Sequence, residues 1–128
     1  MTNNNQVLVP GPDHPISLTR TGDRVTVKLG GRVIADTTDA ITLQEASYPA
    51  VQYIPLADVD PAVLRSSDHT TYCPYKGMAS YHSLEIGDDV APAALWFYPA
   101  PHDAVAEIKD HAAFYPDRVD SIEVHRAA

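Results

Sequence analysis

The chain has 128 residues, a formal net charge of −8 and a single cysteine, Cys73. This length is typical of one domain with its own hydrophobic core, and one cysteine excludes both an intrachain disulfide and a cysteine-based zinc site. The acidic charge would repel a phosphate backbone, so we expect no nucleic-acid partner.

The sequence also bears on the cellular compartment. The first fifteen residues show no signal-peptide pattern, and no apolar run approaches the roughly 20 residues that span a membrane. A lone cysteine suits a reducing environment. We therefore expect a cytoplasmic protein with no membrane partner.

Eleven prolines favour many turns and short strands over long helices. Residues 1–19 are polar and rich in proline, which predicts an N-terminal arm, and residues 20–126 predict a single mainly β domain. Apolar and polar residues alternate over 24–29, as in a half-buried strand. The Gly30-Gly31 pair and a second strand over 32–36 complete a predicted hairpin.

The middle of the chain predicts further short elements. Ile41 and Leu43 alternate toward Glu45 in one strand, and a second strand follows around Tyr53. Asp60 is a suitable N-cap and Pro61 a suitable first helical residue, so one helical turn is expected there.

The last third of the chain predicts a hairpin, a helix and a final strand. Strands over 79–86 and 90–98 flank a Gly-Asp-Asp turn, and Pro92 then requires a sheet edge or a bulge. Apolar residues fall on one helical face over 103–114, which predicts a helix of about three turns. A last strand is expected over 118–125. The fold class predicted is a single compact antiparallel β domain with one helix in its C-terminal half.

Three prolines follow tyrosine, at Pro49, Pro99 and Pro116. Ring stacking on proline favours the cis isomer, so we predict that at least one of these three peptide bonds is cis.

The densest group of reactive residue types lies at 68–77, around Cys-Pro-Tyr-Lys-Gly. Cys73 is a candidate nucleophile because Lys76, three residues away, would favour the thiolate. His69 and His82 are candidate general bases. The alternative is that Cys73 is a small buried hydrophobic residue.

Aromatic residues and one ion pair suggest a ligand pocket near this loop. Trp96 and Tyr98 have the same parity on one strand and would share a face. Pro74 and Gly77 constrain the loop so that it can aim Lys76 at a definite point, with Glu45 as its expected partner in the empty protein. A carboxylate or phosphate of a ligand could replace Glu45. We predict a pocket whose ligand-binding residues are Tyr53, Thr71, Tyr75, Tyr81, Trp96 and Tyr98, with Cys73, Lys76 and Glu45 as candidate catalytic residues.

No two histidines have the spacing of a metal site, and the chain has no glycine-rich phosphate loop. We therefore predict neither a bound metal nor a cofactor.

Several motifs resemble one known family of prokaryotes and fungi, domain-of-unknown-function family 427. They are His14-Pro15-Ile16, the stretch ending at Asp36, Glu45 with Tyr48-Pro49, Tyr53-Ile54-Pro55, Asp58-Val59, Thr71-x-Cys73-Pro74-Tyr75-Lys76-Gly77-x-Ala79-Ser80-Tyr81, Trp96-x-Tyr98-x-x-Pro101 and Ala113-Phe114-Tyr115-x-x-Arg118-Val119. The resemblance implies a compact, mainly β domain similar to the β-tent group, with Glu45, Tyr53, Cys73, Lys76, Tyr81 and Trp96 in one shared pocket.

The family also carries a nucleotidyltransferase-like name. A phosphate-transferring enzyme would need metal-binding carboxylates and a phosphate cradle, and this sequence shows neither pattern. Three hypotheses follow: a domain that binds a small molecule in a Tyr/Trp-lined pocket, with or without enzymatic activity; a Cys73-dependent transferase or hydrolase; or a non-enzymatic interaction module. The oligomeric state is left open.

Overall fold

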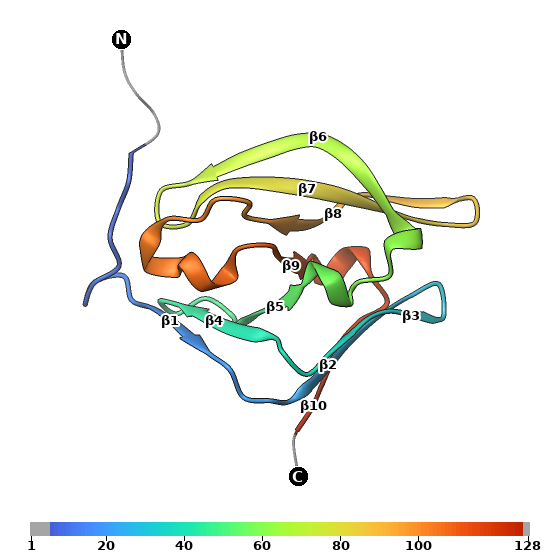
Figure 1. Ribbon diagram of the computed structural model, residues 1–128, viewed down its shortest axis with the longest axis horizontal. Helices are drawn as coiled ribbons and strands as arrows, with labels where there is room; N and C mark the ends of the chain where they lie inside the picture. The colour runs from blue at the N-terminus through green and yellow to red at the C-terminus, as the bar shows by residue number, and fades with distance from the viewer. Residues whose placement is uncertain (1–5, 127–128) are drawn as a thin grey trace.

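The computed structural model describes residues 6–126 and is mainly β, with ten strands in two antiparallel sheets (Figure 1). The larger sheet has seven strands in the order β1 (Ile16–Thr19), β4 (Ile41–Glu45), β5 (Val51–Pro55), β9 (His111–Phe114), β8 (Asp89–Phe97), β7 (Gly77–Ile86) and β6 (Leu64–Cys73). The smaller sheet has the order β10 (Ser121–His125), β2 (Arg24–Leu29) and β3 (Arg32–Thr37). The predicted fold class, a single antiparallel β domain, is confirmed.

Both predicted hairpins are present, and each turns at glycine residues with positive φ. Gly30 and Gly31 both have positive φ, at 60° and 76°, as a tight two-residue turn between β2 and β3 requires. Strands β7 and β8 meet at Gly87, and their register shifts where β8 contains Pro92, so the predicted bulge is also present.

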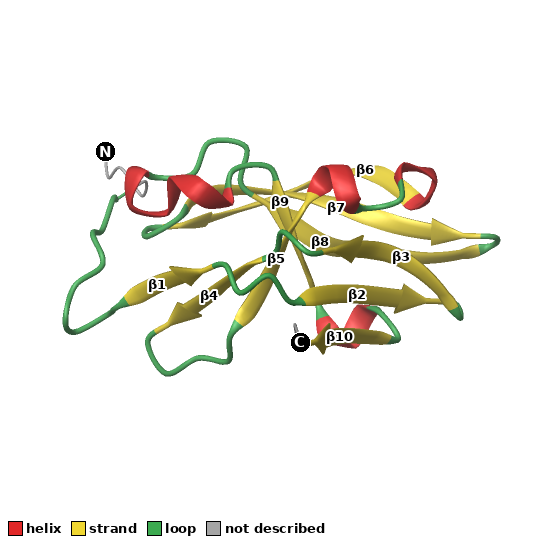
Figure 2. Ribbon diagram, turned by 60° about the horizontal axis from the view of Figure 1, so that its bottom comes forward, coloured by secondary structure: helices red, strands yellow, loops and turns green. Residues whose placement is uncertain are grey.

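Short 3₁₀ helices connect the strands: η1 (Leu56–Asp58), η2 (Pro61–Val63), η3 (Asp103–Ile108) and η4 (Pro116–Arg118) (Figure 2). The Asp60 side chain caps η2 by accepting a bond from the amide of Ala62, as predicted. No helix in the described part of the chain is long and apolar enough to cross a membrane.

The predicted helix over 103–114 is wrong. Residues 103–108 form η3, whose backbone is not helical at Val105, and residues 111–114 form the buried strand β9. Val105 and Ile108 are both buried in the same cluster of apolar residues, although the backbone at Val105 is not helical. The positive φ of Asp110, 58°, turns the chain into β9.

The N-terminal arm is shorter than predicted. Residues Ile16–Thr19, which the sequence assigned to it, form β1 and pair with β4 at the edge of the larger sheet. Ile16 and Leu18 pack there against buried apolar residues. The prediction of a cis bond is also wrong, because the Tyr48–Pro49, Tyr98–Pro99 and Tyr115–Pro116 bonds are all trans.

Two clusters of buried residues form the core. One lies between the smaller sheet and the middle of the larger sheet and includes Val27, Ile54 and Leu95. The other lies under the β1, β4 and β5 end of the larger sheet and includes Ile41, Tyr53 and Tyr81. The candidate site is built on the second cluster.

Candidate functional site

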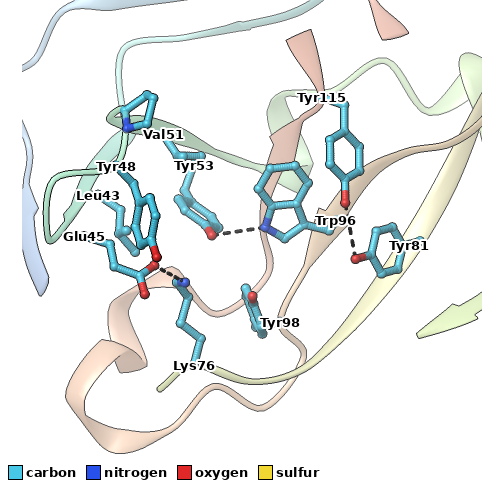
Figure 3. Close-up of a pocket in the computed structure, with 11 residues that line it drawn as sticks. Leu43, Glu45, Tyr48, Val51, Tyr53, Lys76, Tyr81, Trp96, Tyr98 and Tyr115 are labelled. Carbon is cyan, nitrogen blue, oxygen red and sulfur yellow. Dashed lines mark hydrogen bonds and ion pairs between the residues drawn. The ribbon is translucent and has the colours of Figure 1, made fainter. Parts of the chain in front are cut away.

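A cavity of about 290 Å³ lies over the second core cluster. Strands β4, β5, β7 and β8, together with the turn between β6 and β7, contribute its walls (Figure 3). Its lining residues are Leu43, Glu45, Tyr48, Pro49, Val51, Tyr53, Lys76, Tyr81, Trp96, Tyr98 and Tyr115. We call it the head cavity.

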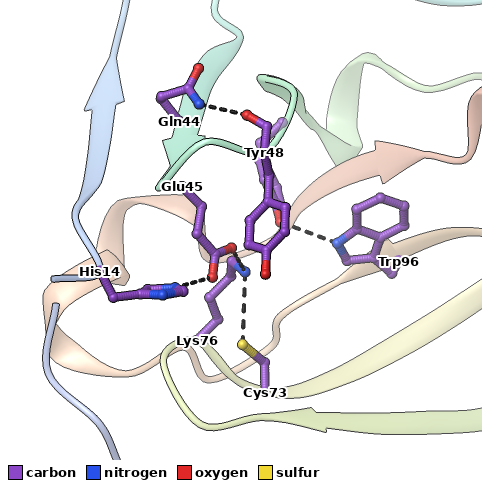
Figure 4. A network of polar contacts seen from close by, with 8 residues as sticks. His14, Gln44, Glu45, Tyr48, Cys73, Lys76 and Trp96 are labelled. Carbon is purple, nitrogen blue, oxygen red and sulfur yellow. Dashed lines mark hydrogen bonds and ion pairs between the residues drawn. The ribbon is translucent and has the colours of Figure 1, made fainter.

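The predicted ion pair between Lys76 and Glu45 is confirmed. The Nζ atom of Lys76 lies 2.5 Å from Oε1 of Glu45, and Lys76 as a whole is only 9% exposed (Figure 4). A lysine buried to this extent needs a partner, because an unpaired ammonium would lose its hydration without compensation. The same Nζ lies 3.7 Å from Sγ of Cys73.

The turn that carries Lys76 is held from two sides. The amide of Leu8 donates to the carbonyl of Pro74, and the amide of His102 donates to the carbonyl of Lys76 itself. Gly77 follows with a φ of 114°, and a Cβ there would lie 3.3 Å from the carbonyl oxygen of Ala100. Only glycine suits both the conformation and the space, so the turn places Lys76 at a fixed position.

Residues 6–15 form an N-terminal strap that crosses this turn. The Tyr72 hydroxyl donates to the carbonyl of Gln6, at the start of the strap. At its other end, His14 Nε2 lies 2.7 Å from Oε2 of Glu45, and the His14 ring stacks on Tyr75 at 4.0 Å with an interplanar angle of 6°. Glu45 therefore has a separate partner on each oxygen.

These contacts decide the charge of Glu45. Burial raises the pKa of its carboxyl group, but the hydrogen bonds from Lys76 and His14 outweigh burial and lower the pKa overall. Glu45 is ionised at neutral pH, so its charge balances that of Lys76.

The tyrosine hydroxyls of the head cavity fall into two groups. Tyr81 lies 2.8 Å from the Thr71 hydroxyl and 3.4 Å from the Tyr115 hydroxyl. Tyr53 accepts a bond of 3.1 Å from the Trp96 indole N–H and makes no other side-chain hydrogen bond within residues 6–126, so its own proton has no acceptor there. The Tyr98 hydroxyl has no hydrogen-bond partner among the described residues.

The phenol protons stay in place at neutral pH. Burial raises the pKa of Tyr53 and of Tyr98 far above the ordinary value of 10.0 and raises that of Tyr115 to about 12. Tyr53 and Tyr98 therefore each keep a proton to donate, and both residues line the head cavity.

One comparison with known proteins decides the family. Residues 17–125 match the family described as domain of unknown function (DUF427). The chain belongs to the DUF427 family. The resemblance on the motifs around Cys73 and Trp96 is thereby confirmed. No curated protein matches the chain.

In this DUF427 domain, most of the predicted site residues come together. Glu45, Lys76, Tyr53, Tyr81, Trp96 and Tyr98 all line the head cavity. Thr71 and Tyr75 do not line it: the first holds Tyr81 and the second holds His14. Cys73 is half-buried and also outside the lining.

The candidate bases lie elsewhere. The His69 ring lies 4.5 Å from that of Tyr81, and the His82 ring stacks on Phe97 at 4.8 Å. Burial lowers the pKa of His82, and its Nδ1 atom is buried without a hydrogen-bond partner in the described part of the chain. Within the described residues neither histidine forms a hydrogen bond with Cys73, so no Cys–His pair is assembled here.

Three functional positions were missed. Tyr48 and Tyr115 line the cavity, and His14 holds Glu45 from a segment interpreted as an arm. Tyr115 lies two residues after Ala113, which is buried in β9, but the helix predicted over 103–114 concealed this strand spacing. No group of three or more His, Cys, Asp or Glu residues within 6–126 is placed to hold a metal ion.

Proposed function

We propose that this domain binds a small neutral molecule through a carbonyl oxygen in the head cavity. The observation that carries the proposal is a pair of donors, the hydroxyl groups of Tyr53 and Tyr98, which have no acceptor among residues 6–126 and line the same cavity as the Lys76 ammonium. An oxygen atom that accepts from these groups would complete their hydrogen bonds.

Charge favours a neutral ligand over an anion. Glu45 already balances Lys76, so a ligand carboxylate would add an uncompensated negative charge to a partly dehydrated site. The net charge of −8 on the chain also disfavours anions. An ammonium has three N–H groups, so Lys76 can donate to a carbonyl oxygen while it keeps its bond to Glu45.

The size of the cavity sets the size of the group. A volume of about 290 Å³ is at the lower end of the range for ligand pockets, so the head cavity accommodates a compact polar group with a few carbon atoms. The rings of Tyr53, Trp96 and Tyr98 would contact the flat faces of an amide, ketone or ester group.

The other two hypotheses have less support. A Cys73-dependent enzyme would need the thiol to reach the ligand, and Cys73 does not line the cavity. An interaction module would not need donors directed into a cavity. As part of the same proposal we place the protein in the cytoplasm, because its single cysteine suits a reducing compartment.

Butanamide, butanoate and butylammonium test the proposal, because they differ in charge and match in length. Trp96 is the one tryptophan of the chain, so its indole N–H signal in NMR spectra reports on the cavity. Butanamide should shift this signal saturably and more strongly than either ion. Tighter binding of butanoate, or no saturable shift with any of the three, would refute the proposal.

Two tyrosine variants locate the binding. Tyr98→Phe should weaken butanamide binding about fivefold, as expected for the loss of one hydrogen bond worth about 1 kcal/mol. Tyr72→Phe is the matched control, since the Tyr72 hydroxyl contacts Gln6 and His102 and lies outside the lining. Equal effects of the two substitutions would contradict the assigned position.

A further inference from the structure

We infer that the ligand of this domain carries an apolar alkyl or aryl body, and that this body lies in a second cavity between the two sheets. The inference rests on the proposed function, because the head cavity would hold the carbonyl end of the same molecule. We call the second space the inter-sheet cavity.

The inter-sheet cavity is the larger of the two, at about 790 Å³. It lies between β5 and β9 of the larger sheet and β10 of the smaller one. Its walls are mostly apolar, and the lining residues are Tyr48, Pro49, Ala50, Val51, Gln52, Ile54, Trp96, Phe114, Pro116, Asp120, Ser121, Ile122 and Val124. A space with these walls suits an occupant that is mainly hydrocarbon.

The two cavities share walls. Tyr48, Pro49, Val51 and Trp96 line both of them, so the head cavity and the inter-sheet cavity adjoin each other at these four residues. In the inferred complex the carbonyl oxygen faces Lys76 and Tyr98, and the rest of the molecule extends past Trp96 and Tyr48 into the inter-sheet cavity. The adjacency of the two cavities is the reason for assigning one ligand to both.

The exposure of the walls supports an apolar occupant. Tyr48 is 60% exposed and Val124 is 46% exposed, although both are large hydrophobic residues in the lining of this cavity. Water in contact with them is unfavourable, and an alkyl chain or ring would displace it.

Several polar groups of the lining already have partners within the protein. Asp120 accepts a bond from the amide of Gly31 through its side chain, and Gln52 accepts one from the Thr42 hydroxyl. Ser121 bonds the Glu123 carboxylate. A hydrocarbon chain or ring needs no polar partner in this cavity.

A series of linear primary amides tests the inference: butanamide, hexanamide and octanamide, titrated by NMR against the intact protein. Each methylene that enters the inter-sheet cavity should tighten binding roughly fourfold. Amide signals from β10 should shift with octanamide and not with butanamide. Tyr98→Phe should weaken all three amides by a similar factor, since each has the same carbonyl end.

A pair of valine variants provides the matched control. Val124→Glu places a charge at the edge of the inter-sheet cavity, and should remove most of the dependence on chain length while butanamide binding is retained. Val90→Glu makes the same change at a valine that is 57% exposed, in neither lining, and should leave the series unchanged. Circular dichroism of both variants checks that they fold.

The outcomes separate the two proposals. If the affinity is the same for all three amides while Tyr98→Phe still weakens them, the second cavity is not used and the inference fails alone. If Tyr98→Phe has no effect, or no amide binds, the proposed function itself fails. Equal effects of the two valine substitutions would overturn the assignment to the inter-sheet cavity.

Discussion

The indole N–H of Trp96 on β8 donates to the hydroxyl of Tyr53 on β5, at 3.1 Å, across the intervening strand β9. The two rings meet edge to face, with centroids 6.4 Å apart and an interplanar angle of 87°. Trp96 pairs with Ala113 of β9, and the register of β5 with β9 brings Tyr53 level with the same alanine. The small side chain of Ala113 leaves room for the two larger ones to meet.

Tyr53→Phe should destabilise the protein, whereas Tyr98→Phe should not. The first substitution leaves the N–H of the half-buried Trp96 without its acceptor, which should cost about 1 kcal/mol, the lower end of the cost for an unsatisfied donor. The second removes a hydroxyl with no partner among residues 6–126. Urea denaturation of the two variants measures the difference, and equal losses of unfolding free energy would contradict these assignments.

Ala113→Leu should separate the two rings. Ala113 is fully buried, so three extra carbon atoms would force Tyr53 and Trp96 apart, and the overpacking should cost about 1–3 kcal/mol. The Trp96 indole signal should move toward that of a free N–H. An unchanged indole signal in a folded variant would show that Ala113 does not set this contact.

Lys76→Met should destabilise the protein by about 1–2 kcal/mol at neutral pH. This loss of stability is smaller than the loss expected for breaking a fully buried ion pair. Glu45 keeps His14 as a partner in the variant, and the Lys76–Glu45 pair is partly accessible to solvent. The folded-state pKa of Glu45 is lowered, so its contribution to stability is present above about pH 4.5 and is lost as the pH falls through the folded pKa. The difference between variant and wild type should therefore shrink below pH 4.5.

Lys28→Met is the control for this experiment. Lys28 pairs with Glu123 on the surface, with both side chains more than 40% exposed, and such pairs contribute little. Denaturation across pH 3 to 7 should show a clear pH-dependent difference for Lys76→Met and a smaller one for Lys28→Met. The reverse order would contradict the importance of the Lys76–Glu45 pair.

His14→Ala should loosen the N-terminal strap. The substitution removes both the hydrogen bond to Glu45 and the stacking on Tyr75, leaving the strap to be held by backbone contacts such as that of Leu8. Hydrogen exchange at the Leu8 amide should accelerate several-fold. His111→Ala removes a ring that contacts the carbonyl group of Lys109, two positions before it, and should leave the Leu8 amide unaffected.

Cys73→Ala should leave butanamide binding within about twofold of wild type, because the thiol does not line the head cavity. The same variant should lose stability only modestly, as expected for a half-buried side chain. A loss of binding as large as the one expected for Tyr98→Phe would instead favour the hypothesis of a Cys73-dependent function.

Local chemistry explains which elements could be predicted. The positive φ angles of Gly30, Gly31 and Gly87 account for the two hairpin turns. The side-chain cap of Asp60 and the proline that follows it account for the start of η2. The helix prediction failed because the apolar spacing over 103–114 fits two 3₁₀ turns followed by a strand equally well. Strand β6 was not predicted, because an edge strand with mostly exposed polar residues lacks alternation.

The candidate site also combines features that the sequence could predict with features that it could not. The Lys76–Glu45 pair was predictable, because a constrained turn and a buried lysine require a carboxylate nearby. The role of His14 was not, since it depends on a strap whose path is set by contacts with residues about 30 or more positions away. The inter-sheet cavity depends on how two sheets meet, which no local pattern contains.

The pairing of β1 with β4 has a consequence for how the chain tolerates shortening. A chain that began at residue 20 would lose β1 and leave the N–H and C=O groups of β4 along that side without partners. An open strand that carries Ile41 and Leu43 is a template for joining other chains, so self-association rather than simple unfolding is the expected failure. The first strand thus covers the edge of β4 and leaves only its own four residues as the exposed edge at that side of the sheet.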